Sequence, residues 1–229
     1  MIRARTIFNV AVTAARDGVM PLRLARTAIR DFHAIQRTWE LQSLLGEVRR
    51  LRPSVVVEIG THKGGTLVCW SALAPASAHI VSIDMICAES GLGTREEDLA
   101  RVRAQLRPGQ RLSAITGDSH AQETWHRLSD VLAGAPVDFL WIDADHSYAG
   151  VKQDMEMYAP LVRPGGLIAL HDIHGGAANP QAQSHLYWQE IKPRHRTREF
   201  IAEREPGGGM GIGIVYVPAH ARADDRFSP

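Results

Sequence analysis

The sequence predicts an α/β fold with a doubly wound, seven-stranded, mostly parallel sheet and an N-terminal helical extension. From Val55 onward, short apolar runs alternate with amphipathic segments of helix length, as in βαβ units joined by right-handed crossovers. Glycine, acidic and histidine residues follow these runs, and ligands of parallel sheets bind at the carboxyl ends of the strands. The 229 residues suffice for one such domain and an extension.

The composition excludes several classes of protein. With 45% hydrophobic residues and a formal net charge of +1, the chain resembles neither a disordered protein nor an obligatory nucleic-acid binder. No apolar stretch approaches the roughly 20 residues that span a bilayer. Cys69 and Cys87 are too far apart for a Cys-x-x-Cys site and fit a reducing compartment, which predicts a cytoplasmic protein.

Residues 1–52 form the predicted N-terminal helical extension and contain ten arginines against four acidic residues. Phe32, Ile35 and Trp39 are expected to extend the apolar stripe of a following helix. That helix is predicted by apolar residues at helical spacing, namely Leu41, Leu44, Leu45, Val48 and Leu51. The stripe predicts packing on the sheet or on a second subunit, hence a homo-oligomer. A basic face for a membrane surface or an acidic partner is the alternative.

The remaining elements fall in one predicted domain, residues 53–218, followed by a flexible tail, residues 219–229. A helix is expected near residues 182–192. Strands are expected at residues 55–59, 79–84, 111–116, 137–143, 166–172, 197–203 and 211–217. The last two strands would complete the seven-stranded sheet.

The first predicted strand leads into a glycine-rich turn that opens a helix. Glu58 is followed by Gly60, Thr61, Gly64 and Gly65. Glycines allow the backbone to approach a ligand closely, and Glu58 can orient this turn or meet an ammonium group. The Glu-x-Gly-x-x-x-Gly spacing differs from the Gly-x-Gly-x-x-Gly of dinucleotide sites, which argues against a dinucleotide-dependent oxidoreductase.

Two further strand ends carry groups that suit a nucleoside. Asp84 ends the second strand, where a carboxylate can accept hydrogen bonds from both ribose hydroxyls. Asp118 and Ser119 follow the third strand, where either side chain can reach the exocyclic amine of adenine. Capping of the next helix is the alternative role for this pair.

The fourth and fifth strands end in carboxylates and imidazoles. Asp143, Asp145 and His146 follow the fourth strand, and His171 and Asp172 end the fifth. Because these strands are neighbours in the predicted sheet, Asp143 and Asp172 are expected to converge on one cation. His171 would be a third ligand or would orient the others, and the donor set favours Mg²⁺, with Mn²⁺ as the alternative. Asp145 is expected to be a loop or cap acceptor.

The glycine turn resembles motif I of class I S-adenosylmethionine-dependent methyltransferases, which have a Rossmann-like fold. Residues 143–146, Asp-Ala-Asp-His, are similar to the Asp-Ala-Asp-Lys of metal-dependent O-methyltransferases acting on catechols and caffeoyl esters. There the first Asp binds the metal and the Lys is a proposed base. His146 replaces that Lys, as in antibiotic and macrolide-sugar O-methyltransferases. The resemblance covers residues 41–217 and implies S-adenosylmethionine as the cofactor.

His171 departs from both groups of relatives. The catechol-type enzymes have an Asp-Asn pair after the fifth strand, and the macrolide and cephalosporin-type relatives have an acidic pair. The resemblance therefore implies a metal at Asp143 and Asp172 more directly than it implies a role for His171.

Methyl transfer from a sulfonium needs an oxygen nucleophile that is at least partly deprotonated. A divalent cation lowers the pKa of a hydroxyl, and His146 can take its proton, so His146 and Asp143 are the predicted catalytic residues. The predicted function is an S-adenosylmethionine-dependent O-methyltransferase that acts on a hydroxyl of a sugar or an antibiotic- or polyketide-like small molecule.

Three alternatives remain at this stage. One is a metal-independent methyltransferase in which His146 alone activates the acceptor, and another is a non-catalytic S-adenosylmethionine-binding subunit. The Asp-x-Asp of residues 143–145 also matches sugar-nucleotide glycosyltransferases, which the glycine turn and Asp84 disfavour. His146 can instead be a helix-start residue. Weaker candidates for the acceptor pocket follow Asp172, namely His174, Asn179, His185 and Trp188.

Overall fold

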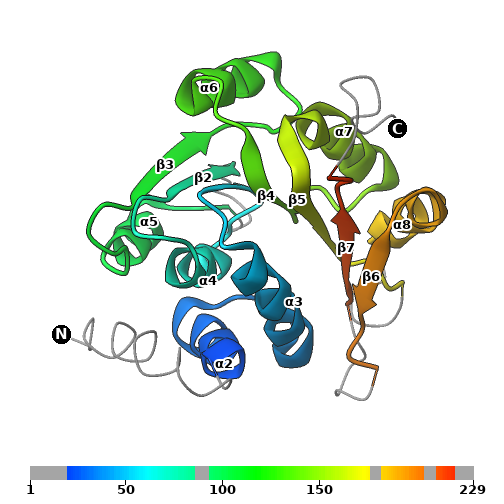
Figure 1. Ribbon diagram of the computed structural model, residues 1–229, viewed down its shortest axis with the longest axis horizontal. Coiled ribbons are helices and arrows are strands. Elements are labelled where there is room, and N and C mark those ends of the chain that lie inside the picture. Colours follow the sequence, from blue (N-terminus) through cyan, green and yellow to red (C-terminus); the bar gives the residue numbers. More distant parts are fainter. Residues whose placement is uncertain (1–19, 86–92, 176–181, 204–209, 220–229) are drawn as a thin grey trace.

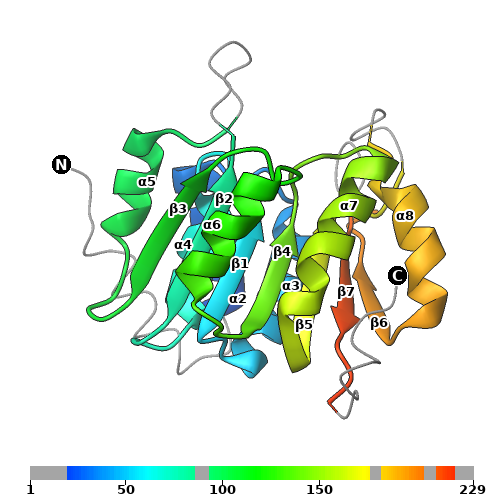
Figure 2. The same cartoon turned by 90° about the horizontal axis from the view of Figure 1, so that it is seen from above.

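The structure is a computed structural model that describes residues 20–85, 93–175, 182–203 and 210–219. A seven-stranded sheet lies at its centre with helices on both faces (Figures 1 and 2). Its strands are β1 (Val55–Ile59), β2 (His79–Asp84), β3 (Arg111–Thr116), β4 (Val137–Ile142), β5 (Val162–His171), β6 (Thr197–Phe200) and β7 (Ile212–Tyr216). The predicted fold class is confirmed.

Two groups of helices cover the sheet, each over its own hydrophobic cluster. One face carries α2 (Met20–Phe32), α3 (Thr38–Leu51), α4 (Gly65–Leu73) and α5 (Glu96–Arg103). The other carries α6 (Gln122–Leu132), α7 (Tyr148–Tyr158) and α8 (Ser184–Ile191). In the described part of the chain, no helix combines the length and the apolar character needed to cross a membrane.

The strand order β3-β2-β1-β4-β5-β7-β6 reverses direction at β1. Strands β1 to β5 pair in parallel, and β7 is antiparallel to both β5 and β6. Ile59 at the end of β1 lies beside Ile83 on one side and Ile142 on the other. The residues that follow these three strands therefore meet at one edge of the sheet, at the point where ligands of such folds bind.

Strand β5 is longer than predicted. It begins at Val162, which pairs with Val137, and the register shifts before Leu167 pairs with Phe139. The Pro-Gly-Gly sequence at residues 164–166 indicates a turn, but pairing resumes beyond an irregularity in which Gly165 has a φ of 75°. The other strands agree with the predicted ranges to within a few residues.

The predicted apolar stripe through the N-terminal extension is wrong upstream of α3. Helix α2 ends at Phe32 and α3 begins at Thr38, and Ile35 and Trp39 are 58% and 48% exposed. His33 has a φ of 56°, which ends the helical path. The intervening residues, 33–37, form a connection that we call the α2–α3 segment, and it leaves the helical surface.

Helix α3 is fastened to the antiparallel end of the sheet by a buried glutamate. One carboxylate oxygen of Glu40 accepts hydrogen bonds from the backbone N–H groups of Ala202 (2.8 Å) and Gly211 (3.1 Å). Glu47, one helical turn pair further along, accepts a hydrogen bond from Arg198 at 2.7 Å. Since four α3 leucine and valine side chains also join the sheet core, α3 packs on this chain's own sheet.

We expect Glu40→Ala to lower the free energy of unfolding by roughly 2 to 4 kcal/mol, because it leaves two buried N–H groups without their acceptor. Glu40→Gln retains an acceptor oxygen and should cost less. Urea unfolding followed by circular dichroism measures both. Equal losses for the two variants would contradict the assigned role of the two hydrogen bonds.

Candidate active site

A cavity of about 610 Å³ lies at the carboxyl ends of the parallel strands. Each of the strands β1 to β5 contributes residues from its end or from the loop that follows it. Ten of the residues predicted to form the site line the cavity, namely Gly60, Thr61, Gly65, Asp84, Asp118, Ser119, Asp143, His146, His171 and Asp172. The volume falls in the range of small-molecule sites.

The glycine turn is held directly against the end of β4. Gly60 has a φ of 85°, and a Cβ added there would lie 2.1 Å from the carbonyl oxygen of Asp143. The backbone N–H of Asp143 donates to the carbonyl of Ile59 at 2.8 Å, and Gly60 N–H donates to Ile83 at 2.9 Å. Only glycine fits this junction, so the turn and Asp143 have a fixed relative position.

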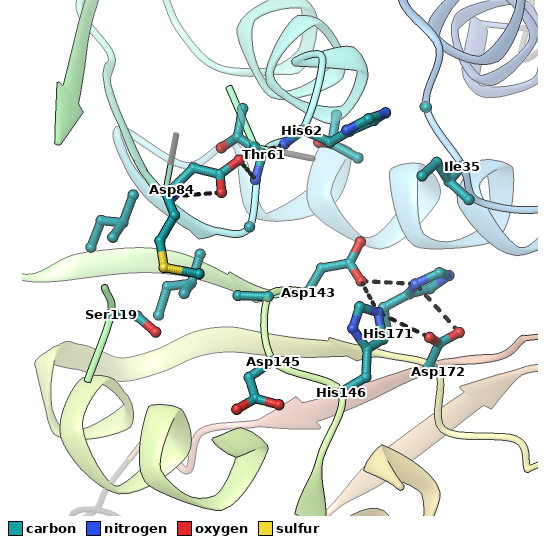
Figure 3. A pocket seen from close by; sticks show the side chains of 18 of the residues that line it. Ile35, Thr61, His62, Asp84, Ser119, Asp143, Asp145, His146, His171 and Asp172 are labelled. Atoms are coloured by element: carbon teal, nitrogen blue, oxygen red, sulfur yellow. Dashed lines mark hydrogen bonds and ion pairs between the residues drawn. The ribbon is translucent and has the colours of Figure 1, made fainter. Parts of the chain in front are cut away.

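Asp84 fastens the glycine turn from the other side. Its Oδ2 accepts hydrogen bonds from the backbone N–H groups of Thr61 (3.0 Å) and His62 (2.7 Å) and from the hydroxyl of Thr94 (2.7 Å) (Figure 3). Its Oδ1 accepts from the backbone N–H of Met85 at 2.7 Å. A carboxylate oxygen has two lone pairs, so Oδ1 keeps capacity for a further donor from a ligand in the cavity.

Glu58 lies behind the turn and does not line the cavity. It is fully buried and accepts a 2.5 Å hydrogen bond from the indole N–H of Trp70. Burial raises the pKa of Glu58 to about 8, against the opposing effect of the hydrogen bond from Trp70. Gly64, at the N-cap of α4, is likewise outside the cavity lining. The structure thus places both predicted cofactor residues in support of the turn.

The loop after β3 reaches the cavity through Asp118 and Ser119. Asp118 Oδ1 accepts from the backbone N–H of His120 at 2.9 Å, and the Ser119 carbonyl accepts from the hydroxyl of Tyr158 at 2.5 Å. Neither side chain caps α6, whose N-cap is Ala121. Both side chains are therefore placed to meet a ligand.

Two imidazoles and two carboxylates gather at the ends of β4 and β5 (Figure 3). Asp143 Oδ1 is 2.9 Å from His171 Nδ1 and 3.6 Å from His146 Nε2. Asp172 Oδ2 is 3.1 Å from His146 Nε2, and Asp172 Oδ1 is 3.6 Å from His171 Nδ1. The adjacency of β4 and β5 brings these four side chains together, as the sequence predicts.

The carboxylates strengthen the hold of both imidazoles on protons. Burial of His171 acts against its charged form, but the charge and hydrogen bond of Asp143, with the charge of Asp172, outweigh this and raise its pKa to about 9. The hydrogen bond with Asp172 raises the pKa of His146 above its ordinary value, with burial opposing. In the absence of a cation, protons on these rings balance the two carboxylates.

The cluster fits a divalent cation. Among the described residues, Asp143, His146 and His171 can each offer a ligand atom, with these atoms within 4.8 Å of one another. His171 Nε2 is buried and has no hydrogen-bond partner among the described atoms. The predicted ligand set contained Asp172 where this group contains His146, and Asp172 instead contacts His146. Mixed oxygen and nitrogen donors suit Mg²⁺ or Mn²⁺.

Residues 57–173, about half of the chain, match a family model described as a methyltransferase domain. The chain belongs to this methyltransferase family. The predicted recognition and the predicted enzyme class, a methyltransferase, are thereby confirmed.

Curated relatives of this methyltransferase are longer than the chain. Uncharacterized protein y4gI of Sinorhizobium fredii is 28% identical over 223 residues, which are 93% of this chain and 22% of that protein. Uncharacterized protein R132 of Acanthamoeba polyphaga mimivirus is 29% identical over 126 residues, or 55% of this chain and 54% of that protein. The chain thus spans about a fifth of the first relative's length and about half of the second's.

Solved structures of methyltransferases share the fold. Cofactor-bound Rv0187 from MTB has a TM-score of 0.59 and 19% identity, with 90% of this chain and 89% of that one covered. The O-methyltransferase from Bacillus cereus in complex with SAH has a TM-score of 0.56 and 17% identity, covering 87% and 90%. The MycE methyltransferase with Mg, SAH and mycinamycin VI has a TM-score of 0.57 and 20% identity, covering 91% and 56%.

Other predicted residues of the methyltransferase have structural positions. Asp145 Oδ1 accepts from the N–H of Ser147 at 2.8 Å, so it is the loop acceptor that the sequence suggests, although it also lines the cavity. Ser147 is the N-cap of α7, which leaves His146 outside the capping role. Trp188 is fully buried core, His174 and His185 do not line the cavity, and Asn179 and Cys87 lie outside the described residues.

The α2–α3 segment supplies cavity residues that the sequence analysis missed. His33, Ala34, Ile35 and Gln36 all line the cavity. Gln36 Nε2 donates a 2.7 Å hydrogen bond to Asp143 Oδ2. No strand-end motif marks this segment, because it lies upstream of the sheet and its apolar residues fit the period of a continuous helix. The polar His33 and Gln36 within that stripe are the only signal in the segment's sequence.

We expect Glu58→Gln to flatten the pH dependence of the methyltransferase's stability. A pKa raised to about 8 stabilises the fold while the buried carboxyl holds its proton, so this contribution is lost as pH rises toward 8. Gln keeps the neutral shape, so its advantage over wild type should grow from pH 5 to pH 8, by up to about 1.4 kcal/mol per pH unit. Urea unfolding at four pH values measures this, and a pH-independent difference would contradict it.

Proposed function

We propose that the protein is an S-adenosylmethionine-dependent O-methyltransferase that transfers a methyl group to a hydroxyl of a small molecule, a sugar or an antibiotic- or polyketide-like compound. The observation that carries the proposal is that one cavity joins a glycine turn held by Asp84 to the cluster of Asp143, His146, His171 and Asp172. The first part suits a nucleoside with an amino-acid tail. The second suits activation of a hydroxyl.

The donor half of the cavity offers the groups that a sulfonium nucleoside needs. Asp84 Oδ1 can accept a ribose hydroxyl in addition to its bond from Met85. Asp118 and Ser119 line the same cavity beyond β3, where they would meet the adenine edge. When bound, S-adenosylmethionine supplies an electrophilic methyl group on a positively charged sulfur. The structures in complex with SAH, from Bacillus cereus and in MycE, have the same fold and support this donor.

His146 is the proposed general base. Asp172 Oδ2, 3.1 Å from Nε2, favours the tautomer with its proton on Nε2, so Nδ1 carries the lone pair that takes the proton of the acceptor hydroxyl. General-base catalysis typically contributes about 10²- to 10⁴-fold. Asp172 then stabilises the imidazolium that forms. The ring has access to the substrate because His146 lines the cavity and is part exposed.

Asp143 and His171 are the proposed holders of a divalent cation, with Asp172 adjoining. A bound Mg²⁺ or Mn²⁺ supplies Lewis-acid assistance that lowers the pKa of an acceptor hydroxyl. The mixed carboxylate and imidazole donors of this cluster support the assignment. MycE, whose structure contains Mg, also has this fold. Because metal ligands must be unprotonated, the cation would compete with the protons that His171 otherwise holds.

A metal-independent O-methyltransferase is the second candidate, and the contact between His146 and Asp172 favours it. A carboxylate 3.1 Å from an imidazole nitrogen is the arrangement of an oriented base that needs no metal. Methyl transfer in the presence of excess chelator separates the two candidates. Loss of turnover that added Mg²⁺ restores supports the first, and undiminished turnover supports the second.

Three further predictions about the protein remain proposals. We infer a cytoplasmic location, no nucleic-acid partner and homo-oligomerisation through the N-terminal helices. The oligomer would use surface of α2 and α3 other than the side chains that enter the sheet core. Exposed Trp39 is one such apolar residue on α3.

We expect the donor and the cation to depend on different carboxylates. Asp84→Ala should weaken binding of S-adenosylhomocysteine about 10- to 100-fold, because it removes a charged acceptor and loosens the glycine turn. Asp143→Asn and Asp172→Asn should abolish Mn²⁺ binding while donor affinity stays within about threefold. Calorimetry on chelator-treated protein measures both ligands, and the reverse pattern would overturn the assigned roles. An absence of S-adenosylhomocysteine binding to the wild-type protein would overturn the methyltransferase proposal itself.

We expect His146→Gln to reduce turnover about 10²- to 10⁴-fold with donor affinity unchanged. Since Asp172 raises the pKa of His146, the base is unprotonated only above its ordinary value of 6.5, so the wild-type rate in chelator should increase with pH through a limb above that value. Release of S-adenosylhomocysteine with a panel of vicinal-hydroxyl acceptors provides the assay. Retention of the same limb in the Gln variant would exclude His146 as the base.

A further inference from the structure

The α2–α3 segment is held in place at the mouth of the cavity by contacts at both of its ends. Ala34 N–H donates to the carbonyl of Ala28 at 3.0 Å, and Arg101 from α5 donates to the carbonyl of Asp31 at 2.6 Å. A Cβ added to Gly65, at the start of α4, would lie 2.7 Å from the Ala34 Cβ. The segment is therefore packed against the helix that follows the glycine turn, and its side chains have defined positions.

Gln36 is the residue of this segment that reaches the acidic cluster. Its Nε2 donates to Asp143 Oδ2 at 2.7 Å, across 107 residues of sequence, and the residue is only 6% exposed. A hydrogen bond to a carboxylate is stronger than one between neutral groups, and burial increases its strength. The bond joins the N-terminal extension to the residue that the proposed function places on the cation.

The two oxygens of Asp143 have different surroundings. Oδ1 faces His171 Nδ1 at 2.9 Å and His146 Nε2 at 3.6 Å, whereas Oδ2 accepts the bond from Gln36. Rotation of the carboxylate about its Cβ–Cγ bond would break the contacts on both sides at once. Gln36 thus fixes which oxygen faces the imidazoles.

The second polar atom of Gln36 is unpaired. Its Oε1 is buried and accepts no hydrogen bond from any of the residues that the structure describes. A buried carbonyl without a donor costs about 1 to 3 kcal/mol, so a purely structural role for this amide would be poorly rewarded. Gln36 also lines the cavity, and polar groups of this kind are retained where a site requires them.

We infer that Gln36 is a positioning residue of the active centre, which orients Asp143 through Nε2 and makes the N-terminal extension part of the catalytic unit. The inference rests on the proposed function in one respect, since it takes Asp143 as a cation ligand. Partners that orient metal ligands typically change metal affinity by about 10- to 100-fold when they are removed. Gln36 should have an effect of this size, although it is far in sequence from the other residues of the cluster.

The test is Mn²⁺ calorimetry on full-length wild-type, Gln36→Leu and Gln110→Leu proteins. Gln110 is the matched control, because it is 8% exposed and its amide bonds to the carbonyls of Ser71 and Pro75, away from the cavity. We expect Gln36→Leu to weaken Mn²⁺ binding at least tenfold and Gln110→Leu to lower stability with Mn²⁺ affinity unchanged. Unaltered affinity in Gln36→Leu, or equal losses in both variants, would overturn the inference.

A double-mutant cycle keeps the inference testable if wild-type protein binds no Mn²⁺, a result that would count against the metal in the proposed function. Chemical unfolding of Gln36→Leu, Asp143→Asn and the double variant measures the coupling of the two side chains. Non-additive changes in the unfolding midpoint support positioning of Asp143, and strict additivity overturns it. If Gln36→Leu does not fold, Gln36→Asn, whose amide is one methylene shorter, takes its place in both experiments.

Discussion

The close approach of β1 and β4 at Gly60 and Asp143 is the constraint on which the rest of the site depends. Backbone hydrogen bonds link the end of β1 to both neighbouring strands, and the space that a Cβ would need at Gly60 is filled by the carbonyl of Asp143. The turn that would hold the donor and the carboxylate that serves the acceptor are consequently parts of one rigid junction. Preorganisation of this kind lets two reactants meet without reordering the protein.

Around that junction, charge is balanced among side chains from four elements. Two carboxylates and two imidazoles share protons at the ends of β4 and β5, with Glu40 from α3 adding to the negative field at His171. The same arrangement can accept a cation when protons leave, or can hold a single proton on an oriented base. A fully buried Glu58 behind the turn avoids adding another charge, because burial favours its neutral form.

Sequence reasoning was effective where strand periodicity and strand-end chemistry coincide. Asp84, Asp143 and Asp172 follow apolar runs, and parallel pairing necessarily brings such ends to one edge. It was ineffective for Ile35, because helical period alone does not reveal that the chain leaves a helix at His33. Glu58 shows a further limit, since a strand residue next to a functional turn can face the core, and only the packing of Trp70 decides which.

The family match begins at residue 57, whereas one wall of the cavity comes from residues 33–36. The conserved chemistry of a methyltransferase domain and the shape of its entrance are thus encoded in separate stretches of this chain. Substitutions at exposed Ile35 can alter which molecules enter without touching a strand, a glycine or a charged group of the core. Such a division allows divergence of substrate choice among relatives at little risk to folding or catalysis.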